Sequence, residues 1–157
     1  MAIGLRPLFE RLTAIVEAVQ PREQVRQTFF CVEEDGLEVG LEQRFQSGSV
    51  RGFEWSLSEA PTEYGVAGPV ASCAVQAGLT LTVGYATQPD RRLLQIQMGQ
   101  DAQALQAAIM DPAEWQTATT GIDHITPPAD GGIEYTEGEE GVVLMQIPFQ
   151  VQYREAT

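Results

Sequence analysis

The residues best suited to chemistry are few and lie far apart in the sequence. The chain of 157 residues has one histidine, His124, and no cysteine or second histidine stands near it. Cys31 and Cys73 fit neither the spacing of a metal site nor that of a disulfide framework. Both fall at apolar-face positions of expected strands, so we interpret them as buried free thiols. We predict no metal site and no cofactor, with His124 in a structural or surface role.

Carboxylates are numerous, but their spacing marks none of them out for catalysis. Two acidic clusters, residues 33–35 and 134–140, lack the Asp-x-Asp-x-Asp-Gly spacing of a calcium loop, and we interpret both as solvated turns. The sequence has no nucleophile elbow, no glycine-rich nucleotide-binding motif and no zinc-protease helix motif. Trp55 and Trp115 fit core or interface packing better than a ligand platform. We therefore predict no catalytic residue and a protein that is not an enzyme.

The charge balance argues against a protein that binds nucleic acid through its phosphates. The net charge is −13 at pH 7, and all nine basic residues are arginine. Proteins that hold nucleic acid by its phosphates need a basic patch, which this composition disfavours. No apolar run reaches the ~18 residues of a membrane span, and Arg6, Glu10 and Arg11 interrupt the segment where a secretion signal is apolar. We expect one soluble domain over residues 1–157, made in the cytoplasm and without membrane contact.

Periodic apolar residues predict two helices that position the rest of the chain. In residues 3–19 the apolar side chains recur at three- and four-residue steps, which is typical of an amphipathic helix covering a sheet. A second helix is expected to begin after Asp90, which is a good N-cap. It is expected to stop at Asp111, because a residue before proline disfavours the helical conformation.

Alternating patterns predict the strands. They cover residues 25–33, 52–58, 71–85, 121–126, 133–135 and 142–154. In 52–58, Phe53, Trp55 and Leu57 are expected to point inward, and 71–85 is expected to be a central strand. Residues 37–50 and 60–69 are predicted loops. Because Pro148 gives no N–H to a ladder, the closing strand is predicted to lie at an edge or to bulge there.

The order of these elements predicts the fold class. Strands precede and follow the second helix without the regular strand–helix alternation of a parallel sheet. This order favours an α+β fold, with a mainly antiparallel sheet and two helices packed on one face.

Short phrases in the second half of the chain resemble a known family. The second helix ends on Ala-Ile-Met-Asp-Pro at 108–112, and Gly-Ile-Asp-His-Ile follows at 121–125. The chain then closes on residues 141–154, which end in Phe-Gln-Val-Gln-Tyr-Arg. With the order of elements, these phrases resemble the tail terminator (tail completion) proteins of long-tailed bacteriophages. The element order covers the whole chain, and the phrases cover about the last 50 residues.

This resemblance implies a virion structural protein that is assembled in the host cytoplasm. Family members form a hexameric ring at the head-proximal end of the tail tube, where the ring ends tube polymerisation and joins the tail to the head. The implied partners are other copies of the chain, the tail tube protein and a head-completion or connector protein. A closed head-to-tail ring of acidic subunits lets DNA pass without specific binding, because a negative lumen repels phosphates.

The two predicted loops supply candidate contact residues for oligomer or partner binding. Arg44, Phe45 and Arg51 lie in or beside the first loop, and Tyr64 lies in the second. Long ordered loops in small domains are often functional, and a floppy surface loop is the alternative.

Two other functions are also compatible with the sequence. Small residues on the 71–85 strand fit the lining of a cavity, as in a small-ligand-binding α+β module of non-viral role. The acidic composition also suits a chaperone or an inhibitor that mimics nucleic acid.

Overall fold

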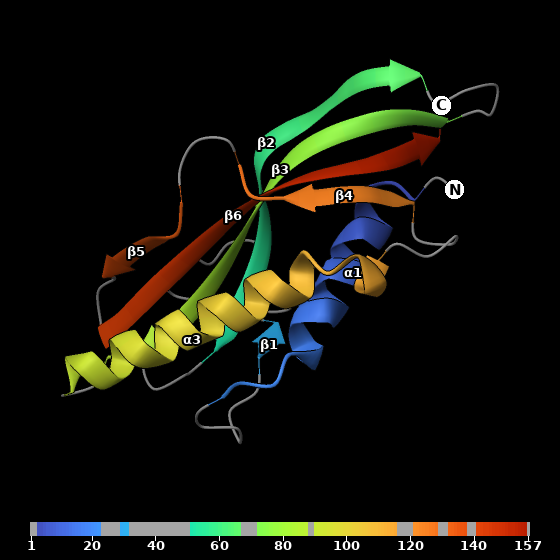
Figure 1. Ribbon diagram of the computed structural model, residues 1–157. Helices are drawn as coiled ribbons and strands as arrows, with labels where there is room; N and C mark the ends of the chain where they lie inside the picture. The colour runs from blue at the N-terminus through green and yellow to red at the C-terminus, as the bar shows by residue number, and fades with distance from the viewer. Residues whose placement is uncertain are drawn as a thin grey trace.

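The protein is described from a computed structural model, in which a curled sheet carries helices on one face (Figure 1). The description covers residues 3–22, 29–31, 51–66, 72–87, 90–115, 121–128, 132–137 and 141–156. The predicted α+β fold with a mainly antiparallel sheet is confirmed. Within these ranges no helix combines the length and apolarity needed to span a membrane. The predicted loop at 37–50 lies outside the described residues.

The two long helices form where periodicity and capping predict them. Helix α1 spans Leu5–Ala18 and helix α3 spans Arg91–Ile109. The Asp90 side chain accepts hydrogen bonds of 3.1 Å from the backbone N–H groups of Arg92 and Leu93, so it caps α3 as predicted. Helix α3 ends before Pro112, and the short helix α4 (Pro112–Trp115) follows.

In the part of the chain that the structure describes, six strands form one sheet in the order β1-β2-β3-β6-β4, with β5 also paired to β6. Every pair is antiparallel except β1 with β2. The strands are β1 (Phe30–Cys31), β2 (Gly52–Val66), β3 (Ser72–Ala86), β4 (Ile122–Thr126), β5 (Glu134–Glu137) and β6 (Val142–Ala156). The prediction that 71–85 forms a central strand is confirmed, because β3 pairs with β2 on one side and β6 on the other.

The closing strand β6 lies inside the sheet, so the prediction of an edge strand is wrong. Strand β6 pairs with β3 along its whole length without a register shift. On its other side, β5 pairs with β6 as far as Gln146, and β4 pairs with β6 from Gln150 onward. Pro148 lies between the part of β6 that pairs with β5 and the part that pairs with β4. On that side of β6 no described strand needs a hydrogen bond from its backbone nitrogen.

Strand β2 continues through much of the second predicted loop. It runs to Val66 despite Pro61, so the loop prediction is wrong for residues 60–66. The pairing with β3 contains three register shifts, which accommodate the residues that break the alternation. One shift lies beside Gly78, where an added Cβ would be 2.9 Å from the Cβ of Glu59.

One hydrophobic core lies between the helices and the inner face of the sheet. The predicted inward stripe of α3 is buried there, with Leu94, Met98, Ala102, Leu105 and Ile109. Strands β3 and β6 contribute their alternating apolar residues to the same core. Of the three residues predicted to point inward from the start of β2, Phe53 and Trp55 are buried, but Leu57 is 45% exposed. The helices therefore cover only the first part of β2.

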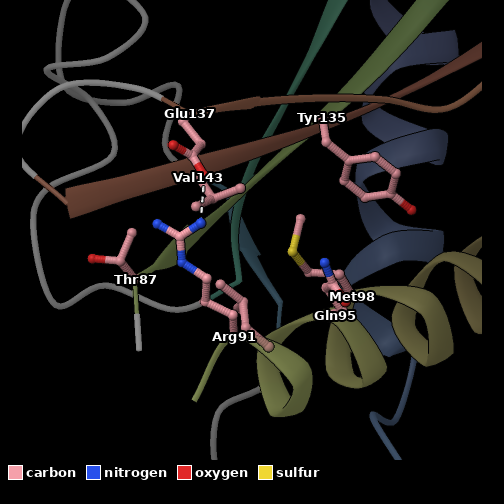
Figure 2. Close-up of a pocket in the computed structure, with 8 residues that line it drawn as sticks. Thr87, Arg91, Gln95, Met98, Tyr135, Glu137 and Val143 are labelled. Carbon is pink, nitrogen blue, oxygen red and sulfur yellow. Dashed lines mark ion pairs between the residues drawn. The ribbon is translucent and has the colours of Figure 1, made fainter. Parts of the chain in front are cut away.

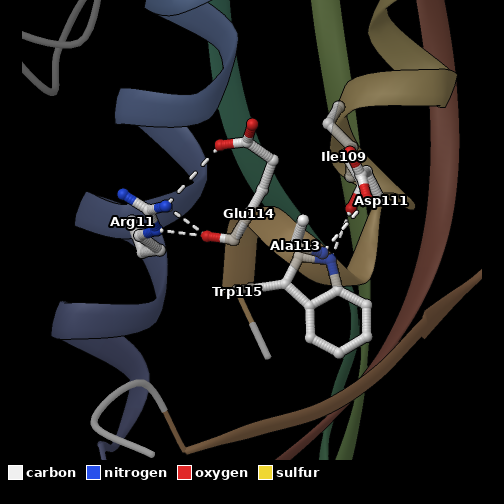
Figure 3. Close-up of polar contacts among 6 residues, drawn as sticks. All are labelled: Arg11, Ile109, Asp111, Ala113, Glu114 and Trp115. Carbon is white, nitrogen blue, oxygen red and sulfur yellow. Dashed lines mark hydrogen bonds and ion pairs between the residues drawn. The ribbon is translucent and has the colours of Figure 1, made fainter. Parts of the chain in front are cut away.

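Helix α4 is held against α1 by a polar clamp (Figure 3). The guanidinium of Arg11 donates from Nε and Nη2 to the backbone carbonyl of Glu114, and Nη2 also lies 3.7 Å from the Glu114 carboxylate. Trp115 is buried, and its Nε1 donates to the carbonyl of Ile109 at 2.9 Å. These contacts join α1 to α4, which directly follows the end of α3.

Candidate functional site

The four predicted contact residues do not form a single described site. Arg44 and Phe45 lie outside the described residues. Tyr64 lies in β2, but its side chain is outside the description. Arg51 directly precedes β2, and its side chain is fully buried. The expectation that Arg51 belongs to an exposed loop reaching a neighbour is therefore wrong.

Arg51 belongs instead to a buried polar cluster that ties α3 to the sheet. Its Nε donates to Oδ2 of Asp101 at 2.7 Å, and its Nη2 donates to Oδ1 at 3.2 Å. The hydroxyl of Tyr85 donates to the same carboxylate at 2.7 Å. The Arg51 Cζ also lies 5.8 Å from the ring centroid of Phe29. These partners offset the cost of burying the two charges.

The backbone of Arg51 has an equally specific setting. Its φ is 65°, a left-handed conformation that is uncommon for a residue with a side chain. Its N–H donates to the carbonyl of Gly84 at 2.8 Å, and its carbonyl accepts from the N–H of Phe30 at 3.2 Å. Arg51 thus joins β1, β2 and β3 through its backbone and α3 through its side chain.

One feature of the sequence could have indicated this cluster. Asp101 lies three residues after Met98 and four before Leu105, so it falls on the apolar stripe of α3. A charged residue on an inward stripe indicates a buried partner of opposite charge. Which arginine supplies that charge depends on the tertiary fold.

The other residues considered for chemistry lie apart from one another. His124 is exposed on β4, whereas Trp55 and Trp115 are buried, as the packing interpretation predicts. Cys73 is buried and Cys31 is half-buried. Burial, together with the nearby Glu63 carboxylate, raises the pKa of the Cys73 thiol. Across the described part of the chain, no group of three or more potential metal ligands gathers.

A cleft of about 700 Å³ opens between the first half of α3 and strand β5 (Figure 2). Leu94 and Met98 line it from α3, and Val143 lines it from β6. Tyr135 of β5 reaches across toward Met98. At one end of the cleft, Nη1 of Arg91 lies 3.9 Å from Oε1 of Glu137. The cleft combines an apolar floor with a polar rim, which is typical of a binding site.

The opposite face of the sheet carries a shallower hollow of about 390 Å³. Leu57 and Ser58 line it from β2, Thr80 from β3 and Pro148 from β6, with Glu134 of β5 at its margin. Strand β5 therefore contributes side chains to a hollow on each of its faces, and all four of its residues are exposed. This strand, its cleft and the outer edge of β2 are the candidate interaction surfaces.

The comparisons with known proteins do not place the chain in a family. No protein-family model matches the sequence. No curated protein matches it significantly either.

Proposed function

We propose that this protein is a virion structural subunit that forms a ring at the head-proximal end of a phage tail tube. As such a subunit it ends tube polymerisation and joins the tail to the head. It acts through contacts with other copies, with the tail tube protein and with a head-completion or connector protein. The proposal starts from the resemblance of the sequence to tail terminator proteins, and the sheet supplies its structural support.

The observation that carries the proposal is that, within the described residues, the sheet has two different edges. From Ser56 to Val66, β2 has no described strand partner on its outer side. At the other edge lie β4 and β5, which each pair with β6 and with no other described strand. Two different edges are what a head-to-tail ring requires, because each subunit presents one surface to each neighbour.

The strand directions are compatible with that arrangement. Strand β2 runs antiparallel to β3, β3 runs antiparallel to β6, and β6 runs antiparallel to β4 and β5. Strand β2 therefore runs antiparallel to β4 and β5. In copies related by rotation about an axis along the strands, β2 of one copy meets β4 or β5 of the next as an antiparallel neighbour. Pro61 and the register shifts of β2 protect this edge from indiscriminate pairing.

The charge supports the same proposal. Each copy carries −13, so a closed ring of six copies surrounds its channel with acidic subunits. A negative channel repels DNA phosphates and lets the genome pass without being held.

A second candidate function, a small-ligand-binding module, is favoured by the cleft beside α3. The inward residues of β3, which are compatible with the lining of a cavity in the sequence, pack into the core instead. The cleft lined by Arg91, Met98 and Tyr135 offers another place for a ligand. Its rim side chains are largely exposed, so it does not exclude water as a catalytic pocket does.

Deleting the gene from the phage that carries it tests the proposed function. We expect electron micrographs to show tails of uncontrolled length or heads without tails, with both restored by supplying the protein. Mass photometry of the purified protein mixed with tail tubes is expected to show a ring. Normal particles in the deletion strain would disprove the proposal. A ligand-dependent rise in melting temperature in a protein that stays monomeric would favour the second candidate.

A further inference from the structure

The cleft between α3 and β5 has an apolar floor that is already in place. Leu94, Met98 and Val143 are buried, so they have little freedom to lose when a ligand covers them. Tyr135 stands over this floor with 55% of its surface exposed. The aromatic ring of Tyr135, at the mouth of the apolar cleft, offers contact area for one long apolar side chain of a ligand. Its side chain has few rotatable bonds, so it loses little conformational entropy on binding.

Strand β5 contributes to the cleft both its side chains and the backbone hydrogen-bonding groups along its outer edge. It pairs with β6 on one side and with no other described strand. Tyr135 and Glu137 are two residues apart, so they project from the same face of β5, and both line the cleft. An extended segment added to this edge gains main-chain hydrogen bonds, and it places alternate side chains beside Tyr135 and Glu137.

The charges select the kind of segment. Arg91 and Glu137 form a pair of 3.9 Å between side chains that are 83% and 74% exposed, so water screens it strongly. Glu137 can therefore exchange Arg91 for a cation of a ligand. The net charge of −13 attracts basic segments from a distance and repels another copy of the same acidic chain.

We propose that this cleft binds an extended, basic segment of another protein, which adds as a strand to β5. One long apolar side chain of the segment lies between Tyr135 and Met98. A lysine or arginine two positions away lies beside Glu137, because directly opposed residues of neighbouring strands share a face. Because the segment occupies β5, β2 of a neighbouring copy in the proposed ring is left β4 as its partner. The existence of the site itself does not depend on ring formation.

Fluorescence anisotropy with short labelled peptides tests the site on the full-length protein. The probe is a nine-residue peptide with Leu and Lys two positions apart in a Ser/Thr background. The matched controls replace Leu by Ser or Lys by Glu, and each is expected to weaken binding about tenfold. N-methylation of the alternate amides that face β5 is expected to abolish binding, whereas methylation of the intervening amides leaves it intact.

Three variants of the protein complete the test. Tyr135→Ala is expected to weaken binding of the probe about tenfold, and Glu137→Gln is expected to reduce both the affinity and its salt dependence. Leu57→Ala removes a 45% exposed apolar side chain from β2, away from the cleft, and it is expected to bind like the parent protein. All three sites are exposed, so folding is expected to be preserved, which circular dichroism checks.

Several outcomes overturn the inference. Equal binding of the Lys→Glu peptide excludes the charge selection. Unchanged binding by the Tyr135→Ala variant excludes the cleft, and indifference to N-methylation excludes strand addition. An absence of binding by the unmodified probe at millimolar concentration excludes the site itself.

Discussion

At the residue scale, a buried ionic cluster joins α3 to the sheet. Asp101 accepts hydrogen bonds from Arg51 and Tyr85, and its side chain and that of Arg51 are at most 1% exposed. A buried ion pair is not in itself strongly stabilising, because desolvation offsets its attraction. Removing only one member of the ion pair lowers stability strongly, however, because the charge of the other member stays buried without it. The cluster therefore specifies how α3 sits on the sheet more than it adds net stability.

Removing the carboxylate tests this interpretation. We expect Asp101→Ala to lower the free energy of unfolding by about 3–5 kcal/mol, because the Arg51 guanidinium loses the carboxylate that it contacts through two nitrogens. The double variant Arg51→Met, Asp101→Leu removes both charges, and it is expected to be more stable than Asp101→Ala. Urea denaturation monitored by tryptophan fluorescence measures both. A double variant less stable than the single one would show that the ion pair itself stabilises the fold.

Tyr85 links the same cluster to pH. Burial, followed by the adjacent Asp101 charge and the hydrogen bond to it, raises the pKa of the Tyr85 phenol well above its usual range. In the unfolded chain the phenol ionises near pH 10. The stabilisation is therefore complete below pH 10 and is lost as the pH rises further. We expect unfolding free energy to fall above pH 10, with Tyr85 contributing about 1.4 kcal/mol per pH unit.

The variant Tyr85→Phe isolates that contribution. It removes the titrating hydroxyl but keeps the ring, so its stability is expected to fall less steeply between pH 10 and pH 11.5. Burial also raises the pKa values of Tyr153 and Cys73, and these groups titrate alike in both proteins. Equal alkaline slopes for parent and variant in urea denaturation would contradict the assignment to Tyr85.

At the element scale, the sequence predicts the helices and strands that have a clear local pattern. It fails to predict those whose extent or position depends on pairing with a distant segment. Helix α1, helix α3 and strand β3 follow from periodicity and capping alone. The second half of β2 does not, because Pro61 suggests a loop while the ladder with β3 carries the strand onward. The position of β6 also depends on distant chain, because Pro148 is tolerated inside the sheet only where β4 and β5 leave a gap.

The candidate surfaces show the same limit. A short strand near Tyr135 is predictable from its sequence, but its position opposite Met98 is set by the pairing of β5 with β6. The burial of Arg51 was missed because the residue follows a stretch without periodicity. Neither the cleft nor the buried cluster has a sequence motif, since each is built from elements that are far apart in the chain.

Two glycines provide a matched test of element packing. At Gly78 of β3, an added Cβ would meet Glu59 at 2.9 Å and Ser58 at 3.0 Å, whereas at Gly99 of α3 it would meet nothing within 4 Å. We expect Gly78→Ala to destabilise the protein by about 1–3 kcal/mol through overpacking. Gly99→Ala is expected to stabilise it by about 0.5–1 kcal/mol, because alanine favours a helix.

Thermal and urea denaturation of the two alanine variants measure these changes. The same substitution is thus expected to have opposite signs in the two elements. If Gly78→Ala were neutral, the bulge of β2 beside Gly78 would have to relax freely, which would contradict a fixed register there.

At the scale of the whole molecule, the fold separates its surfaces by face and by edge. Helices α1 and α3 cover one face of the sheet, while the other face carries an open hollow. The edge of β2 and the edge formed by β4 and β5 lie on opposite sides of the sheet. All of these surfaces belong to a chain of net charge −13. This charge is therefore expected to affect both self-association and the binding of a basic peptide, and changing the salt concentration tests both effects.

Ionic strength is expected to act with opposite signs on the two proposed interactions. Association between copies brings like charges together, so the oligomer fraction at fixed protein concentration should rise from 0.1 M to 1 M salt, as the Debye length shortens from ~10 Å to ~3 Å. Binding of the basic peptide in the cleft attracts opposite charges, and its affinity should fall over the same range. Mass photometry measures the first and fluorescence anisotropy the second. An oligomer that dissociates in salt would mean that complementary charges hold the copies together, which contradicts an interface formed mainly by strand edges.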